Sequence, residues 1–268
     1  GSSGSGKSTL LHMLGGLDRP TEGKVFVDGK DIFALDGEYR RILGYLPQEF
    51  GFYPEFSVHD YLMYIASIKG MRISIARKRV TELLRQVGLA KMQNRKMKKL
   101  SGGMKRRAGI AQAMLNNPKI LILDEPTAGL DPNERIRFRN LISELSQDRL
   151  VLLSTHIVSD IEYIANQVLL MKDGKISHSG TQEEIIQSVP VKVWSCVVAN
   201  NEVEMWQKQF KVSNMKTLSD GIELRILSEK SPHYNAKEET MTLEDIFLYY
   251  FGEKTATRVQ ANIRFAFI

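Results

Sequence analysis

The sequence predicts an α/β fold with a largely parallel sheet, an all-helical insert and a small α+β appendage at its C-terminal end. Short apolar segments alternate with amphipathic stretches through most of the chain. Between residues 58 and 117 the strand signals stop, and apolar residues recur at helical spacing. After Pro190 the pattern changes again. We therefore expect a main domain over residues 1–189, with its insert at about residues 58–117, and an accessory region over residues 190–268.

Six short apolar segments of the main domain are expected to be strands: 25–27, 42–46, 120–123, 150–154, 167–171 and 175–179. The pairs Asp28-Gly29 and Asp173-Gly174 are typical of turns between strands. In the accessory region, residues 191–199 and 222–227 resemble strands, and a helix-like run to Phe210 lies between them. Thr242, followed by Asp245 and an apolar stripe, predicts a capped helix. Residues 255–268 give no assignment.

Composition limits the class of protein. Hydrophobic residues make up 43% and charged residues 25% of the 268, values that are ordinary for a globular protein and argue against disorder of the whole chain. The apolar runs 120–123 and 150–153 are far shorter than the roughly 20 residues that cross a bilayer. The N-terminus shows no export signal. The single cysteine, Cys196, excludes an intrachain disulfide.

The net charge of +6 is unevenly spread. Residues 69–107 hold fourteen Lys or Arg against one acid, Glu82. This surface is consistent with a solvated basic face, an anionic membrane surface, an acidic partner loop or nucleic acid.

The first eight residues fit the phosphate-binding pattern G-x-x-x-x-G-K-[ST] at every fixed position. Glycines let successive backbone N–H groups turn toward phosphate oxygens, and the helix that starts here directs its positive end at the same anion. Lys7 adds a charge, and the Ser8 hydroxyl is a ligand for Mg²⁺. The expected cradle for ATP is Gly1, Ser2, Ser3, Gly4, Ser5, Gly6, Lys7, Ser8 and Thr9. A strand should precede this loop, so we expect the chain to be N-terminally truncated. A Gly-Ser linker would not continue into Gly-Lys-Ser-Thr and an apolar helix.

A second chemical signal is the apolar run 120–123, which ends in Asp124 and Glu125. The run is typical of a buried parallel strand whose carboxyl end faces a ligand. Asp124 there can bind Mg²⁺, and Glu125 can accept a proton from the water that attacks the γ phosphate.

Together with these two signals, the segment Leu100-Ser101-Gly102-Gly103-Met104 resembles the signature motif of the ABC ATPase family. Three further motifs are similar to those of that family in order and spacing. They are a Q-loop at Tyr45-Leu46-Pro47-Gln48, a D-loop at Ala128-Gly129-Leu130-Asp131 and an H-switch at Ser154-Thr155-His156.

The resemblance implies a head-to-tail dimer in which the cradle of one ATPase subunit and the signature of the other hold each ATP. It implies that Ser101, Gly102, Gly103 and Asp131 bind the nucleotide across the dimer. It also implies that Gln48 contacts Mg²⁺ and the attacking water, and that His156 holds the γ phosphate. Met104 stands where the family often has Gln, and the aromatic residue that stacks on adenine would precede Gly1.

The resemblance further implies an ATPase peripheral to the cytoplasmic face of the membrane, paired with a separate membrane subunit and with a second ATPase subunit, the same or different. Residues 49–57, rich in aromatics, would receive the membrane subunit, unless these aromatics simply pack between insert and core. The segment 242–247 is similar to that of bacterial exporter ATPases for drugs, antimicrobial peptides or sodium. The alternative is a soluble ABC ATPase that acts on the ribosome or DNA, although one compact cassette without heptads favours the transporter, and no nucleic-acid partner is expected. A scaffold that does not hydrolyse ATP is disfavoured by the presence of Glu125 and His156.

Overall fold

The computed structural model describes residue 1 and residues 4–252 of the chain. The described part divides into two compact units, one over residues 4–164 and one over residues 165–252 together with residue 1. This division follows compactness alone, so the domain boundary predicted between residues 189 and 190 stays a prediction. Residues 255–268, which gave no sequence assignment, lie outside the described residues.

A parallel three-stranded sheet forms the centre of the first unit. Its order is β3-β4-β5, with β3 at Leu43–Leu46, β4 at Ile120–Asp124 and β5 at Leu150–Ser154. The strands pair in register, so that Leu43, Ile120 and Leu150 lie side by side. The predicted parallel sheet is therefore confirmed, and the carboxyl ends of its strands share one edge.

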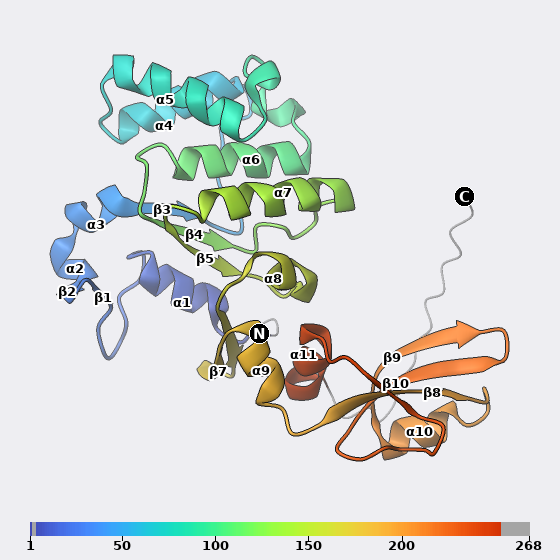
Figure 1. Cartoon of the computed structure of the whole chain (residues 1–268). Coiled ribbons are helices and arrows are strands. Elements are labelled where there is room, and N and C mark those ends of the chain that lie inside the picture. Colours follow the sequence, from blue (N-terminus) through green and yellow to red (C-terminus); the bar gives the residue numbers. More distant parts are fainter. Residues whose placement is uncertain (2–3, 253–268) are drawn as a thin grey trace. The chain divides into compact units, whose positions relative to one another are not determined.

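Two hydrophobic cores lie on opposite faces of this sheet because successive side chains of a strand point in opposite directions. Ile122 of β4 packs with Leu11 of α1 (Lys7–Leu14), whereas Leu121 and Leu123 pack with α6 (Gly102–Ala113) and α7 (Pro132–Leu145). Figure 1 shows α1 on one side of the sheet and α6 and α7 on the other. The sheet thus separates the cradle helix from the signature helix.

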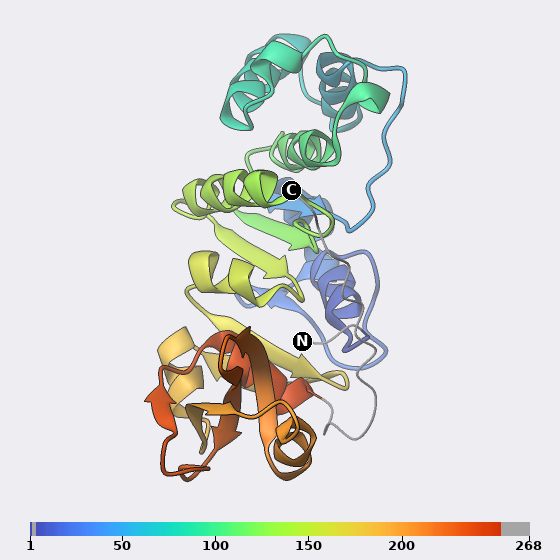
Figure 2. The ribbon, with the colours of Figure 1, turned by 90° about the vertical axis from the view of Figure 1, so that its right-hand side faces the viewer.

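The helical insert has the architecture that its apolar spacing predicts. It contains α4 (Val58–Ile68), α5 (Ile73–Gln86), the 3₁₀ turns Ala90–Met92 and Met97–Lys99, and α6. Tyr61 and Leu62 of α4 and Leu83 of α5 are buried together. Figures 1 and 2 both show α4 and α5 beyond α6, on the side away from the sheet. The structure describes every residue from 58 to 117, and none of them belongs to a named strand.

The remaining elements of this unit connect the sheet to its helices. A hairpin of β1 (Phe26–Val27) and β2 (Lys30–Asp31) turns at Asp28 and Gly29, both at positive φ, as predicted. Two short helices, α2 (Ile32–Leu35) and α3 (Gly37–Ile42), follow it, and the latter delays the strand expected at residue 42 by one residue. Helix α8 (Val158–Ile164) follows β5.

The second unit begins with the predicted hairpin of β6 (Val168–Lys172) and β7 (Lys175–Gly180), followed by α9 (Gln182–Gln187). An antiparallel sheet of order β11-β8-β10-β9 comes next. Its strands are β8 (Lys192–Val198), β9 (Lys211–Leu218), β10 (Gly221–Ser228) and β11 (Lys237–Glu239). Helix α10 (Val203–Gln209) covers one face through the buried Trp206. The α+β appendage is confirmed, with two more strands than the sequence predicted.

Helix α11 (Leu243–Phe251) has the predicted capping box at its start. The hydroxyl of Thr242 accepts from the backbone N–H of Asp245 at 3.3 Å, and the Asp245 carboxylate accepts from the Thr242 N–H at 2.9 Å. The same carboxylate forms an ion pair with Arg225 of β10 at 2.8 Å. One buried acid therefore fastens this helix to the antiparallel sheet.

Candidate functional site

The end of the phosphate cradle, just before α1, has backbone conformations that only glycine adopts readily. Gly4 and Gly6 have φ values of 76° and 94°, and Gly6 is the N-cap of α1. No side chain among the described residues caps the N-terminus of this helix, and its first turn holds no acid. The buried hydroxyl of Ser5 has no hydrogen-bond partner among the described residues. The backbone N–H groups at the uncapped start of α1 and the Ser5 hydroxyl are donors that fit an anion such as a nucleotide phosphate.

The two carboxylates sit at the carboxyl end of β4, where the sequence predicts them. Asp124 is 2% exposed and accepts a hydrogen bond from the Ser154 hydroxyl at the end of β5. The Glu125 N–H donates to the Ser154 carbonyl and hydroxyl oxygens, each at 3.1 Å. Ser154, which sequence reasoning gave no separate role, therefore fixes both acids.

Glu125 leaves the strand in an unusual conformation that directs its side chain back into the site. Its φ is 45°, in a region that non-glycine residues rarely adopt and that is enriched at functional sites. One carboxylate oxygen lies 3.9 Å from Nζ of Lys7, and the other lies 2.8 Å from Nδ1 of His156. Three predicted site residues from three separate segments thus meet at one carboxylate.

Two more positions at this edge can supply ligands to a metal ion. Ser8 lies in the first turn of α1, and Gln48 follows β3 by two residues and is exposed. Mg²⁺ in nucleotide sites takes oxygen ligands from one or two side chains and completes its shell with phosphates and water. Asp124, Ser8 and Gln48 carry side-chain oxygens of the kind that such an ion binds, and the ion would neutralise phosphate charge.

Tyr45, on β3, is part of the electrostatics of this edge. Burial, together with the negative charges of Asp124 and Asp18, raises the pKa of Tyr45 to about 12. Its buried hydroxyl has no hydrogen-bond partner within the described residues. The phenol therefore stays protonated at neutral pH.

The residues of the predicted signature and D-loop lie at the starts of two helices. Ser101 is the N-cap of α6 and accepts from the Met104 N–H at 3.2 Å, while Ser101 and Gly102 are exposed. Asp131 is the N-cap of α7 and accepts from the Glu134 N–H at 2.9 Å. The signature and D-loop residues thus begin two neighbouring helices, across the sheet from the cradle helix (Figure 1).

A close contact joins these two helix starts. A Cβ added to Gly103 would lie 2.5 Å from a carboxylate oxygen of Glu134, so a larger residue there would have to displace the Glu134 side chain. Arg107 of α6 holds that carboxylate with an ion pair of 3.3 Å. Residue spacing gave no signal for this contact, because Glu134 looks like any acid in the first turn of a helix.

The remaining predicted positions are placed as follows. Thr9 is exposed on α1, and Gly1 is described with the second unit. Ser2 and Ser3, also predicted in the cradle, lie outside the described residues. Of residues 49–57, Phe50, Phe52 and Phe56 pack against the main core, whereas Tyr53 is 47% exposed. Packing therefore accounts for part of this aromatic loop.

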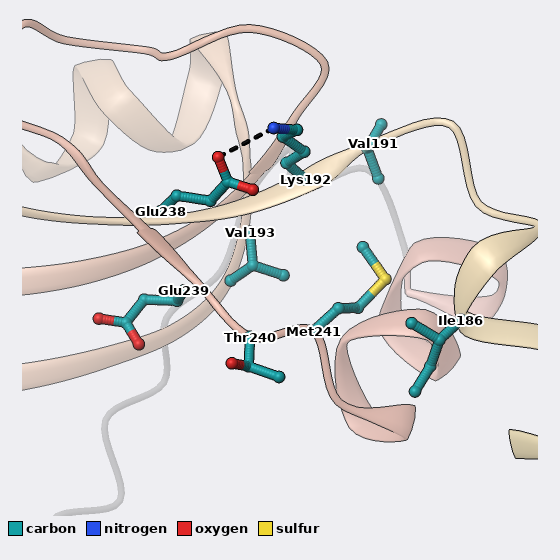
Figure 3. A pocket seen from close by; sticks show the side chains of 8 residues that line it. All are labelled: Ile186, Val191, Lys192, Val193, Glu238, Glu239, Thr240 and Met241. Carbon is teal, nitrogen blue, oxygen red and sulfur yellow. Dashed lines mark hydrogen bonds and ion pairs between the residues drawn. The ribbon is translucent and has the colours of Figure 1, made fainter. Parts of the chain in front are cut away.

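A cavity of about 240 Å³ in the second unit holds none of the motif residues. Figure 3 shows the ion pair of Lys192 and Glu238, 2.9 Å long, on one side and the apolar side chains of Ile186 and Met241 on the other. The charges of Lys192 and Glu238 neutralise each other in this ion pair. The motif residues Lys7, Glu125 and His156 meet instead at the sheet edge of the first unit.

Comparison with known proteins shows the family of the chain. Residues 1–128 match the model of a family described as ABC transporter. The chain is 37% identical over 209 residues to the uncharacterized ABC transporter ATP-binding protein YxlF of Bacillus subtilis (strain 168), across 78% of this chain and 69% of that protein. The chain belongs to the ABC transporter ATP-binding family. As a member of it, the chain is an ABC-type ATPase with a P-loop NTPase core.

Two further relatives of this ABC ATPase carry names that mention resistance or drugs. One is the probable multidrug ABC transporter ATP-binding protein YbhF of Escherichia coli (strain K12), 30% identical over 267 residues, 94% of this chain and 46% of that protein. The other is the linearmycin resistance ATP-binding protein LnrL of Bacillus subtilis (strain 168), 32% identical over 186 residues, 69% of this chain and 60% of that protein. The chain spans less than two thirds of either.

Solved structures of ABC cassettes share the fold. The cbiO1 subunit of Clostridium perfringens, part of the complex cbiONQ, has a TM-score of 0.64 at 29% identity over 70% of this chain and 77% of that one. The cassette MJ0796 has a TM-score of 0.60 at 31% identity over 67% of this chain and 82% of that one. It was solved as a dimer and in a post-hydrolysis state with ADP and Pi.

Proposed function

We propose that this ABC ATPase drives an exporter whose membrane-spanning part is a separate polypeptide, and that it hydrolyses Mg-ATP only when paired with a second ATPase subunit. The observation that carries the proposal is the meeting of Lys7 and His156 at the carboxylate of Glu125. In ATP hydrolysis, a lysine charge can hold the γ phosphate, and a carboxylate can accept the proton of the attacking water. A histidine beside them can contact the same phosphate.

In the proposed mechanism, the cradle N–H groups and Lys7 bind the phosphates of ATP. Lys7 then exchanges its contact with Glu125, 3.9 Å long here, for phosphate oxygens. Glu125 takes a proton from water as the water oxygen attacks the γ phosphorus, and the bond to the ADP oxygen breaks. His156 keeps the carboxylate oriented and contacts the γ phosphate. Asp124, with Ser8 and Gln48, would hold Mg²⁺, which neutralises the charge on the phosphates.

The shared site is supported by the placement of the two halves within one chain. The cradle helix α1 and the signature helix α6 pack on opposite faces of the sheet. Ser101 and Gly102 are exposed at the start of α6, and the first turn of a helix is where backbone N–H groups can bind an anion. We infer that Ser101, Gly102, Gly103 and Asp131 complete the site of a second subunit, in line with the dimer of MJ0796.

The experiment that tests the base and the dimer together is Glu125→Gln. The amide keeps the shape of the side chain but cannot accept the proton, so hydrolysis should fall by about 10²–10⁴-fold while Mg-ATP still binds. ATP should then hold two subunits together, and a dimer should elute in sizing chromatography only with ATP. A matched control is Glu22→Gln on the exposed surface of the same unit. A variant that keeps most of its hydrolysis excludes Glu125 as the base, and one that binds ATP but stays monomeric with a competent partner excludes the shared site.

The membrane partner is proposed to dock beside the aromatic loop. Tyr53 is exposed and packs on Phe56 and Tyr64 with ring centroids 5.0 Å away in each case. Each helix in the described part of the chain is too short or too polar to span a membrane. Purification from detergent extract tests the proposal: co-purification of a multi-span membrane protein supports it, and recovery of rRNA or DNA supports the soluble alternative. The Tyr53→Ser variant should retain less of the membrane protein.

The exporter assignment rests on the names of YbhF and LnrL and on the similarity of residues 242–247 to exporter ATPases. Deleting the gene should raise intracellular accumulation of a cytotoxic compound, and a plasmid copy should reverse it. The Glu125→Gln copy should not.

A further inference from the structure

Asp160 is a fully buried acid that the proposed mechanism does not use. It lies in the first turn of α8, four residues after His156, and is 0% exposed. A carboxylate withdrawn from water in this way is costly unless charged and hydrogen-bonding groups compensate it. The partners of the Asp160 carboxylate therefore identify the segments that this acid connects.

Two segments of the chain each donate a hydrogen bond to one oxygen of this carboxylate. Arg139 of α7 donates from Nε to Oδ1 at 2.8 Å, and the hydroxyl of Thr127 donates to Oδ2 at 2.5 Å. Arg139 also donates to the Ser159 hydroxyl at 3.4 Å, and its guanidinium lies 4.8 Å from the centre of the Tyr163 ring. Both oxygens are thus satisfied by groups from outside α8.

The two segments are the ones that carry Glu125 and Asp131. Thr127, 1% exposed, lies in the loop between these acids. The loop is folded by bonds from the Ala128 N–H to the Glu125 carbonyl at 3.3 Å and from the Leu130 N–H to the Thr127 carbonyl at 3.2 Å. Arg139 lies on α7, the helix whose N-cap is Asp131. The polypeptide from 125 to 139 therefore contacts α8 at both sides of Asp131.

We propose that Asp160 is a positioning residue that fixes the loop from Glu125 to Asp131 against the segment that begins at His156. The proposal rests on the roles proposed above for Glu125 and His156. Neither Thr127 nor Asp160 belongs to the phosphate cradle, so their loss leaves ATP binding intact. It lets the base drift relative to water and phosphate, and a misplacement of about 1 Å can cost 10²-fold in rate.

A purely structural role for the same contacts makes a different prediction. Loss of the Thr127 hydrogen bond would then lower the melting temperature while the folded enzyme turned over at its normal rate. The second unit holds a matched control, because the Ser213 hydroxyl lies 2.8 Å from a carboxylate oxygen of Asp245, itself 2% exposed and paired with an arginine. Ser213→Ala therefore removes the same kind of bond from an antiparallel sheet that carries none of the residues proposed above for hydrolysis.

The test compares Thr127→Val, Thr127→Ser and Ser213→Ala in the full chain by steady-state ATP hydrolysis and thermal melting. In Thr127→Val, kcat should fall about ten- to a hundredfold with KM for ATP within about twofold. Thr127→Ser restores the hydroxyl and should restore kcat. Ser213→Ala should melt earlier with kcat unchanged. If Thr127→Val does not fold, Asp160→Asn, which keeps the shape but loses the charge facing Arg139, should show the same loss of kcat at constant KM.

The proposal is overturned by a normal kcat in Thr127→Val, by a Thr127→Ser enzyme as slow as Thr127→Val, or by an equal loss in Ser213→Ala. Glu125→Gln, assayed alongside, separates this failure from failure of the proposed function. If Glu125→Gln loses hydrolysis and Thr127→Val does not, only the positioning role of Asp160 is wrong. If Glu125→Gln hydrolyses ATP normally, the roles on which the proposal rests are wrong as well.

Discussion

Nδ1 of His156 lies 2.8 Å from Oε2 of Glu125, although the two residues come from the ends of different strands. The backbone N–H of Glu125 bonds to the carbonyl oxygen of Ser154, at 3.1 Å, so the segment that carries the histidine also holds the backbone of the acid. The pairing of β4 with β5 therefore brings the backbones of Glu125 and His156 close to each other. It gives the first prediction.

His156→Ala should reduce ATP hydrolysis by about 10²-fold or more, because Glu125 loses the partner that orients it. Affinity for ATP should change little, since the cradle is untouched. Steady-state kinetics and a binding titration measure the two effects. His59→Ala is the control, because His59 pairs with Asp60 at 3.5 Å on the surface of the same unit. Equal rates for the wild type and His156→Ala would contradict the role of the pair.

Lys7→Ala should weaken ATP binding itself by roughly ten- to a hundredfold, the effect of losing about 1.5–3 kcal/mol of charge-assisted hydrogen bonding. Calorimetric titration of the full chain with Mg-ATP measures it. Lys24→Ala removes the same charge from an exposed position of the same unit and should bind normally. An unchanged affinity in Lys7→Ala would remove this lysine from the cradle.

Gly44→Ala should destabilise the first unit by about 1–3 kcal/mol through overpacking. A Cβ there would lie 2.5 Å from the Ala113 carbonyl oxygen and 2.9 Å from Cγ of Pro118, and the backbone of α6 cannot move aside cheaply. Urea unfolding followed by circular dichroism measures the change. Gly37→Ala is the control, because its added Cβ would meet no atom within 4 Å. Similar midpoints for both variants would show that β3 and α6 do not pack as described.

The second unit should lose stability in acid through Asp245. Burial opposes ionisation of this carboxylate, but hydrogen bonds from Arg225, Thr242 and Ser213 outweigh it and lower its pKa below the ordinary value of 3.8. A lowered folded-state pKa contributes stability above 3.8, and this stability is lost as the pH falls through the lowered value. Asp245→Asn should therefore be less stable than wild type at neutral pH, and the difference should vanish in acid.

Tryptophan emission can follow this transition, because both tryptophans of the chain, Trp194 and Trp206, lie in the second unit. Urea midpoints taken from pH 7 down to pH 2 give the comparison. Asp220→Asn, an exposed acid between β9 and β10, is the control and should follow the wild type. A constant gap between wild type and Asp245→Asn at all pH values would contradict the lowered pKa.

Sequence patterns predicted the fold where burial is one-sided or complete. The strand and the helical insert carry apolar residues at the period of their elements. The strand was therefore predicted at 120–123 and found at 120–124, and the predicted insert at about residues 58–117 is helical. The edge strands β9 and β11 were missed, because Lys211–Leu218 is mostly polar and Lys237–Glu239 is exposed throughout. An edge strand has one open side and often no apolar face to reveal it.

The candidate site divides in the same way. Lys7, Asp124, Glu125 and His156 belong to local motifs, and the structure brings Lys7 and His156 to the carboxylate of Glu125. Their supporting residues could not be predicted. The sequence gives no sign that Asp160 is buried. Its burial depends on the packing of α8 against Arg139 of α7 and against Thr127 of the preceding loop.

The alternation of β4 has a chemical consequence. Leu121 and Leu123 face the core shared with α6 and α7, while Ile122 faces α1. Continuing the same alternation, Asp124 falls on the side of Ile122 and so on the side of the cradle. A slip of one residue in this strand would exchange its apolar contacts and turn Asp124 away from α1. The packing of three apolar side chains therefore determines which face of the sheet the carboxylate of Asp124 occupies.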